Sequence, residues 1–262
     1  MDRLQYCTTL NRPLVKNFAK AFAKKIIRRT GWDVTKLESS FAEDLVLSNL
    51  LHIVQPVAIL DVGANTGQYA DFVRRCGYRG LLVSFEAARE AHAHLMRRAT
   101  DQSRWSIAPL AAVGSHSGSI EMNIAGNSVS SSILPMRRIH EEAAPQSRYV
   151  ATERVPLDTL DNLASPLIPG TGPLFLKIDT QGYEKEVLSG AAKLLPRIGG
   201  IQLELSLTEL YEGAPTFAEM LSLLTQLRFE LHAIAPGFRD QRSGQLLQID
   251  GFFVSSHHVP QP

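Results

Sequence analysis

From Val57 onward, short apolar runs alternate with segments of helical periodicity, and this alternation limits the possible folds more than any other feature. Four runs have the length and composition of strands buried on both faces, namely 57–62, 81–86, 173–179 and 200–206. Helical spacing follows each of them, over 67–76, 88–99, 183–195 and 217–229. Strands that alternate with helices form a mostly parallel sheet covered on both faces, so the sequence predicts an α/β fold.

The segments between these runs predict less regular structure. Residues 105–114 predict a third extended segment, and 118–124 predict an antiparallel excursion from the sheet. The serine-rich stretch 126–132 predicts a loop. The polar stretch 135–150, with prolines at 135 and 145, predicts an irregular connection or a mobile lid. Two last extended segments predict a closing antiparallel pair, 230–235 and 250–255.

The N-terminal region differs in character from the rest of the chain. Residues 14–29 predict a helix with an apolar stripe on one side and lysines and arginines on the other. Such a helix can lie on an anionic membrane surface, or it can dock its stripe on the main domain or on a second subunit. We therefore predict a helical extension over 1–44 and a larger domain over 45–262, and a homodimer is one arrangement that the stripe permits.

Composition excludes several classes of protein. The formal net charge is +1 over 262 residues, which gives no bias toward nucleic acid. Only two cysteines, Cys7 and Cys76, are present and neither has metal-ligand spacing around it, which suits a reducing compartment, although a disulfide between them is the alternative. No apolar run approaches the roughly 18 residues that span a bilayer, and no signal-peptide pattern is present. These features predict a cytoplasmic protein, with peripheral contact at the inner face of the membrane if residues 14–29 bind lipid.

The loop after the first predicted strand, GANTG, favours one kind of ligand over others. Glycines at 63 and 67 permit a tight turn and a close approach of a ligand to the backbone, next to the positive end of a helix. A P-loop would need a lysine and a hydroxyl residue where Gln68 and Tyr69 stand. A dinucleotide loop would need glycine at Asn65, and Asp61 would repel a diphosphate. The loop therefore suits a ligand with an amino group, such as the methionine part of S-adenosylmethionine.

Glu86 ends the second predicted strand, 19 residues after Gly67. An acid at this place can accept hydrogen bonds from ribose hydroxyls, in NAD-binding folds and in adenosylmethionine-binding folds alike. The alternative is an acid at a strand end that faces water.

Several blocks together resemble the FkbM-type S-adenosylmethionine-dependent methyltransferases. The most specific are DVGANTG and KIDTQGYE, joined by SFEA, LDTL, LELSLTELYEG and LLQIDGFFV, and the resemblance covers about 45–255. It implies a Rossmann-like, seven-stranded class I methyltransferase fold with an antiparallel last strand. It also implies methylation of hydroxyl groups on sugars, glycolipids or polyketide-type natural products; that acceptor class, like the net charge of +1, gives no reason to expect a nucleic-acid partner. One departure is Ala87, where the family commonly has proline after the glutamate; we expect a shifted turn there.

The resemblance also implies a set of cofactor-binding residues for S-adenosylmethionine. Asp61 and the Gly63–Gly67 backbone would hold the methionine end, Glu86 the ribose, and the 110–113 segment the adenine. Ser130 and Ser131 could touch cofactor or acceptor, or serve as ordinary loop residues. The predicted cofactor-binding residues are Asp61, Gly63, Ala64, Asn65, Gly67, Gln68, Tyr69, Glu86, Ala112 and Asp179.

Methyl transfer to a hydroxyl group needs a base that removes the proton, and Asp179 at the fourth strand end is the leading candidate. Lys177 lies two residues earlier on the same strand face and could pair with Asp179 or orient the acceptor. Glu204, at the neighbouring strand end, is the competing base. The two carboxylates could instead hold a divalent cation such as Mg²⁺. The alternative for Asp179 is a carboxylate that caps the following helix.

Two further residues and two further functions stay open at this point. Glu184 suits a first-turn helix acid, and His232 a structural histidine or an acceptor-site base. An NAD-dependent oxidoreductase would keep the glycine loop and Glu86, although Asn65 and Asp61 argue against it. A methyltransferase-like binding protein without turnover is the third reading. The acceptor pocket would be formed by loops such as 126–150 and 207–217, whose composition does not identify the acceptor.

Overall fold

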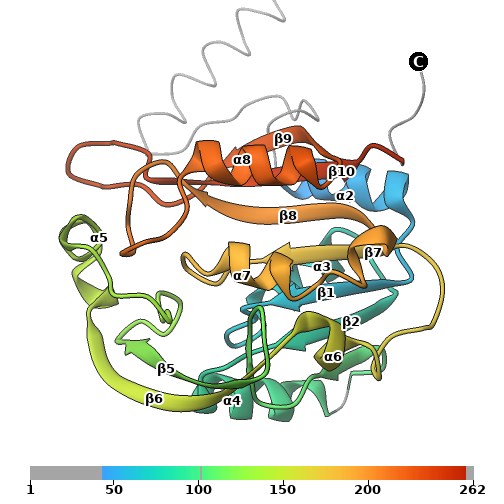
Figure 1. Ribbon diagram of the computed structural model, residues 1–262, viewed down its shortest axis with the longest axis horizontal. Coiled ribbons are helices and arrows are strands. Elements are labelled where there is room, and N and C mark those ends of the chain that lie inside the picture. Colours follow the sequence, from blue (N-terminus) through green and yellow to red (C-terminus); the bar gives the residue numbers. More distant parts are fainter. Residues whose placement is uncertain (1–42, 101, 258–262) are drawn as a thin grey trace, which may run out of the picture. The chain divides into compact units, whose positions relative to one another are not determined.

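The computed structural model describes residues 43–100 and 102–257, and these residues form an α/β domain around a seven-stranded sheet (Figure 1). The predicted helix at 14–29 lies outside the described residues. The strands of the sheet follow the order β3-β2-β1-β7-β8-β10-β9. Their bounds are β1 Ala58–Val62, β2 Leu81–Phe85, β3 Trp105–Ile107, β7 Leu174–Ile178, β8 Ile198–Ser206, β9 Phe229–Pro236 and β10 Gln248–Ser255.

The directions of the strands confirm the predicted fold class. β1 pairs in parallel with β2 and β7, and β7 pairs in parallel with β8. β10 lies between β8 and β9 and is antiparallel to both, which is the reversed last strand that was predicted. All five residues of β1 and of β7 are buried, as expected for central strands covered on both faces.

Two layers of helices supply that cover. On one face, α2 (Glu43–Val54), α3 (Gln68–Arg75) and α4 (Arg89–Ala99) pack on side chains such as Ile59 and Phe252. On the other face, α6 (Leu160–Ala164), α7 (Glu184–Ser189) and α8 (Phe217–Gln226) pack on side chains such as Leu60 and Phe253. Neighbouring residues of one strand thus enter different cores, because successive strand side chains point to opposite faces.

A second, three-stranded sheet has the order β4-β6-β5. Its strands are β4 Ala112–Val113, β5 Gly118–Ala125 and β6 Tyr149–Asp158, and β5 is antiparallel to β6, as predicted for 118–124. The prediction of one extended segment over 105–114 was wrong, since β3 belongs to the large sheet and β4 to the small one. Pro109 lies between them and has no N–H to continue a ladder.

Other segments also differ from the sequence prediction. The stretch 135–150 holds α5 (Arg138–Ala143) and the 3₁₀ turn η1 (Pro145–Ser147), where an irregular connection or a mobile lid was expected. The helix expected over 183–195 ends early, at Ser189, and a 3₁₀ turn, η2, covers Leu195–Arg197. A Cβ on Gly190 would lie 2.0 Å from the carbonyl oxygen of Gly114, so close packing accompanies this early end. Neither α2 nor α6 was predicted.

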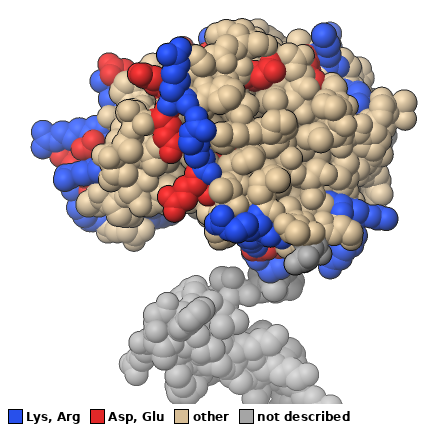
Figure 2. All heavy atoms as spheres, turned by 90° about the horizontal axis from the view of Figure 1, so that it is seen from below, with Lys and Arg blue, Asp and Glu red and all other residues tan. Residues whose placement is uncertain are grey.

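The described residues include no helix with the length and apolar character needed to cross a membrane. Figure 2 shows the face that lies at the bottom of Figure 1. Basic and acidic side chains are interspersed along one side of this face, and uncharged residues cover most of the rest.

Candidate active site

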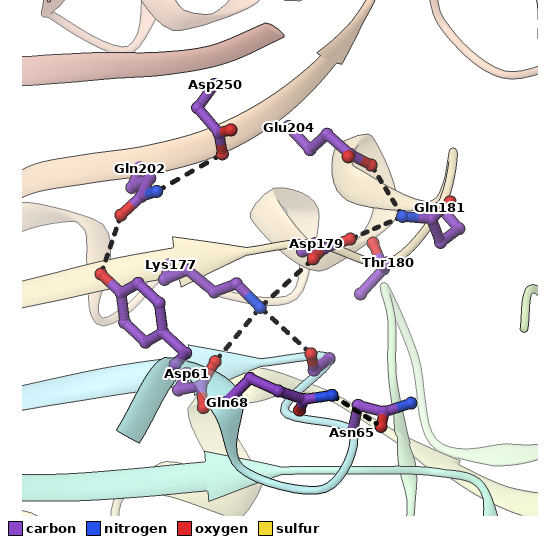
Figure 3. Close-up of polar contacts among 12 residues, drawn as sticks. Asp61, Asn65, Gln68, Lys177, Asp179, Thr180, Gln181, Gln202, Glu204 and Asp250 are labelled. Carbon is purple, nitrogen blue, oxygen red and sulfur yellow. Dashed lines mark hydrogen bonds and ion pairs between the residues drawn. The ribbon is translucent and has the colours of Figure 1, made fainter. Parts of the chain in front are cut away.

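A row of polar side chains crosses the large sheet at the end where its parallel strands finish (Figure 3). Asp61 of β1 is in register with Lys177 of β7, which is in register with Gln202 of β8. Asp250 of β10 is in register with Glu204, two residues further along β8. Residues in register, and residues two apart on one strand, share a face of the sheet. The topology therefore brings these groups together on the face that α3 covers.

Lys177 is at the centre of this row. Its Nζ lies 3.3 Å from Asp61 Oδ1 and 3.5 Å from Asp179 Oδ2, and it donates to the carbonyl oxygen of Gly63 at 3.1 Å. The ammonium also lies 5.4 Å from the centre of the Tyr69 ring. Burial lowers the pKa of Lys177, but the charges of Asp61 and Asp179 outweigh it and raise that pKa above its usual range. Lys177 is therefore a fixed cation that links β1, β7 and the glycine loop.

Asp61 is fully buried beneath this cation. Its Oδ2 accepts a hydrogen bond from Ser84 Oγ at 3.1 Å, and the indole N–H of Trp105 donates to the same Ser84 oxygen. Its Oδ1 has no hydrogen-bond partner among the described residues apart from the nearby ammonium of Lys177. Burial raises the pKa of Asp61, and the charge of Lys177 opposes that rise.

The glycine loop is shaped by two close approaches. Gly63 has φ +77°, and a Cβ there would lie 1.8 Å from the carbonyl oxygen of Asp179. Gly67 has φ +94°, and a Cβ there would lie 2.8 Å from the Trp105 ring. Asn65 also takes a positive φ of 47°, and its Oδ1 accepts a hydrogen bond from the backbone N–H of Thr66 at 2.7 Å. Both glycines are therefore required by the packing of the loop itself.

Glu86 is buried at the end of β2, and its carboxylate holds the turn that follows. Its Oε2 accepts from the N–H of Asn65 at 2.7 Å, and its Oε1 accepts from the N–H groups of Ala87 and Ala88 at 2.9 and 2.7 Å. Burial raises the pKa of Glu86, and these three bonds oppose that rise. A carboxylate has about four lone-pair sites, so one remains for a ligand.

A cavity of about 420 Å³ opens over this row and the glycine loop. Most of the predicted site residues line it: Gly63, Ala64, Asn65, Gln68, Tyr69, Glu86, Ala112, Lys177 and Asp179. As far as the described residues define its wall, Asp61, Gly67 and Glu204 do not contribute to it. Asp61 lies under Lys177, and Gly67 packs on Trp105. The cavity is within the usual size range of small-molecule sites.

Asp179 and Glu204 are bridged by Gln181, which the sequence analysis did not single out. Gln181 Nε2 donates to Asp179 Oδ1 and to Glu204 Oε2, each at 2.7 Å. Burial raises the pKa of Glu204 well above its usual value, and the charge of Asp179 adds to this. An amide donor thus stands between the two predicted metal ligands, and the described residues include no group of three or more His, Cys, Asp or Glu placed to hold a metal.

Sequence reasoning also missed a second polar cluster in the cavity wall. Gln202 donates to Glu43 Oε1 at 3.0 Å and to Asp250 Oδ1 at 3.3 Å, and it accepts from the hydroxyl of Tyr69 at 2.9 Å. Burial, together with the charge of Glu43, raises the pKa of Asp250 to about 7. Glu43 begins a helix that was not predicted. Asp250 sits in a predicted strand, where an acid without a neighbouring motif gives no signal.

The remaining predicted residues have different surroundings. Ser131 lines the cavity, whereas Ser130 accepts a hydrogen bond from the Asn127 side chain at 3.0 Å. Glu184 Oε1 accepts from the N–H groups of Thr180 and Gly182, so it stabilises the turn that starts its helix. Burial raises the pKa of Glu184 to about 7. His232 is exposed on β9 and does not line the cavity in the described part of the chain.

Comparison with known proteins gives a family match and several distant structural matches. The family model described as "Methyltransferase FkbM domain" matches residues 61–231. A search of curated proteins finds no match to the chain.

The solved structures that match are distant. The plantazolicin methyltransferase BamL is 9% identical, with 81% of this chain and 84% of that chain covered and a TM-score of 0.45. An rRNA methylase from Streptococcus thermophilus is 12% identical, with 82% and 98% covered and a TM-score of 0.44. A TehB-like methyltransferase from Corynebacterium glutamicum is 10% identical, with 94% and 100% covered and a TM-score of 0.40.

Proposed function

The chain belongs to the FkbM methyltransferase family, and we propose that it transfers the methyl group of S-adenosylmethionine to a hydroxyl oxygen of a sugar, a glycolipid or a related natural product. The observation that carries the proposal is that Glu86 and Asp179 line one cavity, with the Gly63–Asn65 backbone between β1 and α3 in the same wall. A ribose-binding acid and a proton acceptor are thereby available to a cofactor and a methyl acceptor bound together in this cavity.

The residues of the cavity fit S-adenosylmethionine in their chemistry. Glu86 has lone-pair capacity left for the ribose hydroxyls, and Ala111, Ala112 and Val113 give an apolar wall for the adenine. Glu43 and Asp250 form an acidic part of the wall that suits the ammonium group of the methionine portion. When bound, the cofactor supplies a methyl group on a positively charged sulfur, which makes it a good donor.

Asp61 does not reach this cavity, and its proposed role is therefore indirect. Its carboxylate lies 3.3 Å from Lys177 Nζ, and the same ammonium lies 3.5 Å from Asp179 Oδ2. Asp61 thus fixes Lys177, and Lys177 in turn fixes Asp179. This replaces the predicted direct contact between Asp61 and the methionine end of the cofactor.

Asp179 is the base in this proposal, in preference to Glu204. Asp179 lines the cavity, and its side chain is 36% exposed. Its Oδ1 accepts one bond from Gln181 and its Oδ2 faces Lys177, so lone pairs remain to accept the proton of an acceptor hydroxyl. Glu204 lies behind Gln181, and its raised pKa favours the protonated form, which cannot take a proton.

The acceptor would enter beside Ser131, Ile133 and Tyr183, which also line the cavity. The hydroxyl specificity and the sugar or glycolipid class rest on the family resemblance. A cytoplasmic location, a homodimer and peripheral membrane contact through residues 14–29 stay predictions.

The test is methyl transfer from S-adenosylmethionine labelled in its methyl group to fractionated cell-envelope and metabolite extracts, followed by identification of the labelled product. We expect a labelled hydroxyl oxygen. The Asp179→Asn variant should lower turnover by roughly 100-fold or more, because it removes the base, while it keeps the affinity for S-adenosylhomocysteine. Unchanged turnover would remove Asp179 from the mechanism. Cofactor binding without any transfer would favour a non-catalytic binding protein.

A further inference from the structure

We propose that Gln181 is a positioning residue for the reaction, whose side-chain amide fixes the Asp179 carboxylate in the orientation that accepts the proton of the acceptor. This inference rests on the proposed function and names a residue that the sequence analysis did not single out. It follows from the contacts of one buried amide group with Asp179 and Glu204, drawn in Figure 3, and with Tyr211.

The nitrogen of this amide serves two carboxylates at once. Gln181 Nε2 lies 2.7 Å from Asp179 Oδ1 and 2.7 Å from Glu204 Oε2. An amide nitrogen carries two hydrogens, so each carboxylate receives one of them. Glu204 Oε2 also accepts from Gln248 Nε2 at 2.7 Å, which holds Glu204 at the far side of the bridge. The two acids are thus held together by one shared donor group, the amide nitrogen of Gln181.

The oxygen of the amide is fixed from the other side. Gln181 Oε1 accepts from the hydroxyl of Tyr211 at 2.5 Å, and Tyr211 is fully buried. Ionised carboxylates only accept hydrogen bonds, so an amide rotated by half a turn would face Asp179 with its oxygen and lose the bond from Tyr211. The hydrogen-bond partners therefore allow one orientation of the Gln181 side chain.

The backbone at Gln181 is held as firmly as its side chain. Gln181 has φ +56°, a left-handed conformation that is uncommon outside glycine and that costs about 1–3 kcal/mol where it occurs. Its carbonyl oxygen accepts from Ser132 Oγ at 2.7 Å. Glu184 Oε1 accepts from the N–H groups on both sides, those of Thr180 and Gly182. Such strain persists where surrounding contacts fix it, which is common at functional sites.

These contacts determine how Asp179 is presented to the acceptor. Gln181 engages Asp179 Oδ1 while Lys177 faces Oδ2, so the carboxylate is held at both oxygens and cannot turn about its own axis. Without the amide, Asp179 and Glu204 would lose the donor that they share, and Asp179 Oδ1 would have no fixed partner among the described residues. A misplacement of about 1 Å at a reacting group can cost roughly 100-fold in rate. A residue that acts in this way should affect the chemical step and leave cofactor binding intact.

The experiment compares Gln181→Met, which keeps the length of the side chain and removes the amide, with the matched control Gln226→Met, in which the same change is made on the exposed surface of α8. The probe is methyl-labelled S-adenosylmethionine with a dilution series of the active extract fraction. The saturated rate stands for kcat, the half-saturating dilution stands for KM, and calorimetry gives the Kd of S-adenosylhomocysteine.

We expect Gln181→Met to lower the saturated rate by about 100-fold, with the half-saturating dilution and the Kd of S-adenosylhomocysteine within about twofold of the wild type. Gln226→Met should match the wild type. The double variant Asp179→Asn with Gln181→Met should be no slower than Asp179→Asn alone, because a positioning residue has no effect once the group it positions is gone. If Gln181→Met does not fold, Tyr211→Phe, which removes the bond to Oε1, carries the same test with an expected loss of about threefold to tenfold.

If the wild type transfers methyl groups, three results would overturn this inference and leave the proposed function standing. The first is a saturated rate of Gln181→Met within about threefold of the wild type. The others are a loss of cofactor affinity in Gln181→Met that equals its loss of rate, and a double variant slower than Asp179→Asn by the full effect of Gln181→Met. Absence of methyl transfer by the wild type to any fraction would overturn the proposed function, and this role would fall with it.

Discussion

Replacing Lys177 by methionine tests whether the charge of Lys177 compensates the buried carboxylate of Asp61. Methionine keeps most of the length of the lysine side chain and removes its charge. Asp61 is fully buried, and its Oδ1 lies 3.3 Å from the lysine ammonium. The other oxygen of Asp61 keeps its bond from Ser84, at 3.1 Å, so the substitution isolates the loss of the counter-charge.

The size of the effect follows from that burial. Removal of one partner from a buried ion pair costs about 3–5 kcal/mol, because the remaining charge is left without compensation. With a urea m-value of about 3 kcal/mol per molar for a domain of this size, the midpoint of unfolding should fall by roughly 1–1.7 M. The double variant Asp61→Asn with Lys177→Met removes both charges and should regain a large part of this loss.

The pH dependence of the same variant has a definite sign. Burial already raises the pKa of Asp61 in the wild type, where Lys177 opposes the rise, so without Lys177 this pKa moves further up. A group whose pKa is raised on folding contributes stability at a pH below its pKa in the unfolded chain, and that stability is lost as the pH rises through its pKa in the folded protein. The gap in urea midpoint between wild type and Lys177→Met should therefore be smaller at pH 5 than at pH 8.

Urea denaturation at both pH values, followed by far-ultraviolet circular dichroism, measures these quantities. The reasoning would be refuted by a loss of less than about 1 kcal/mol, or by an equal loss at the two pH values. It would also be refuted if the double variant were no more stable than Lys177→Met alone.

Three further predictions concern the cavity. Gly63→Ala would place a Cβ 1.8 Å from the carbonyl oxygen of Asp179 and should lower the melting temperature and abolish binding of S-adenosylhomocysteine. The control Gly77→Ala shares a positive φ, +91°, but has no described atom within 4 Å of the new Cβ, so it should show only the backbone strain of about 1–2 kcal/mol. Glu86→Ala should weaken binding of S-adenosylhomocysteine by about tenfold or more in calorimetry, since it removes charge-assisted bonds to the ribose, and an unaltered Kd would contradict the assignment. Burial raises the pKa of Asp250 to about 7, so ionisation of this group should tighten S-adenosylmethionine binding as the pH rises from 6 to 7.5. In Asp250→Asn the Kd should depend less on pH. An equal pH dependence of the Kd in the variant and the wild type would exclude a contact between Asp250 and the ammonium group.

The elements that could be predicted are those whose burial produces a recognisable pattern of apolar residues along the sequence. All five residues of β1 and of β7 are buried, and a continuous apolar run is the direct result in the sequence. The strand β6 has no such run, because most of its residues are exposed or half-buried in the small sheet. The segment with α5 and η1 also lacks an apolar period, because each of the two has few residues and so few positions in a core.

The candidate site was predictable in part, through motifs that are local in the sequence. The glycine loop, Glu86 and the Lys177–Asp179 pair stand beside predicted strands, and the structure brings them to one cavity. Gln181 stands within the KIDTQGYE block beside its partner Asp179, yet its other partners come from distant positions, Glu204 in β8 and Tyr211 in a loop. A contact of this kind has no spacing that a single sequence reveals, because it depends on the pairing of strands and loops in three dimensions.

As far as the structure describes the chain, Asp61 and Glu204 do not line the cavity, which shows that a position near a strand end does not by itself bring a carboxylate to the ligand. Asp61, Glu86, Asp179 and Glu204 all stand at or near strand ends, yet only Glu86 and Asp179 line the cavity within the described part of the chain. Asp61 lies inside β1, one position before its last residue, where a long lysine from the neighbouring strand can cover it. Glu204 lies inside β8, behind the amide of Gln181. Whether a carboxylate at a strand end reaches the ligand therefore depends on the side chain that lies between it and the cavity. Lys177 covers Asp61 and Gln181 covers Glu204, and both of these covering side chains also hold Asp179. Asp61 and Glu204 thus anchor the side chains that orient Asp179, which is why the loss of either Lys177 or Gln181 should affect Asp179 first.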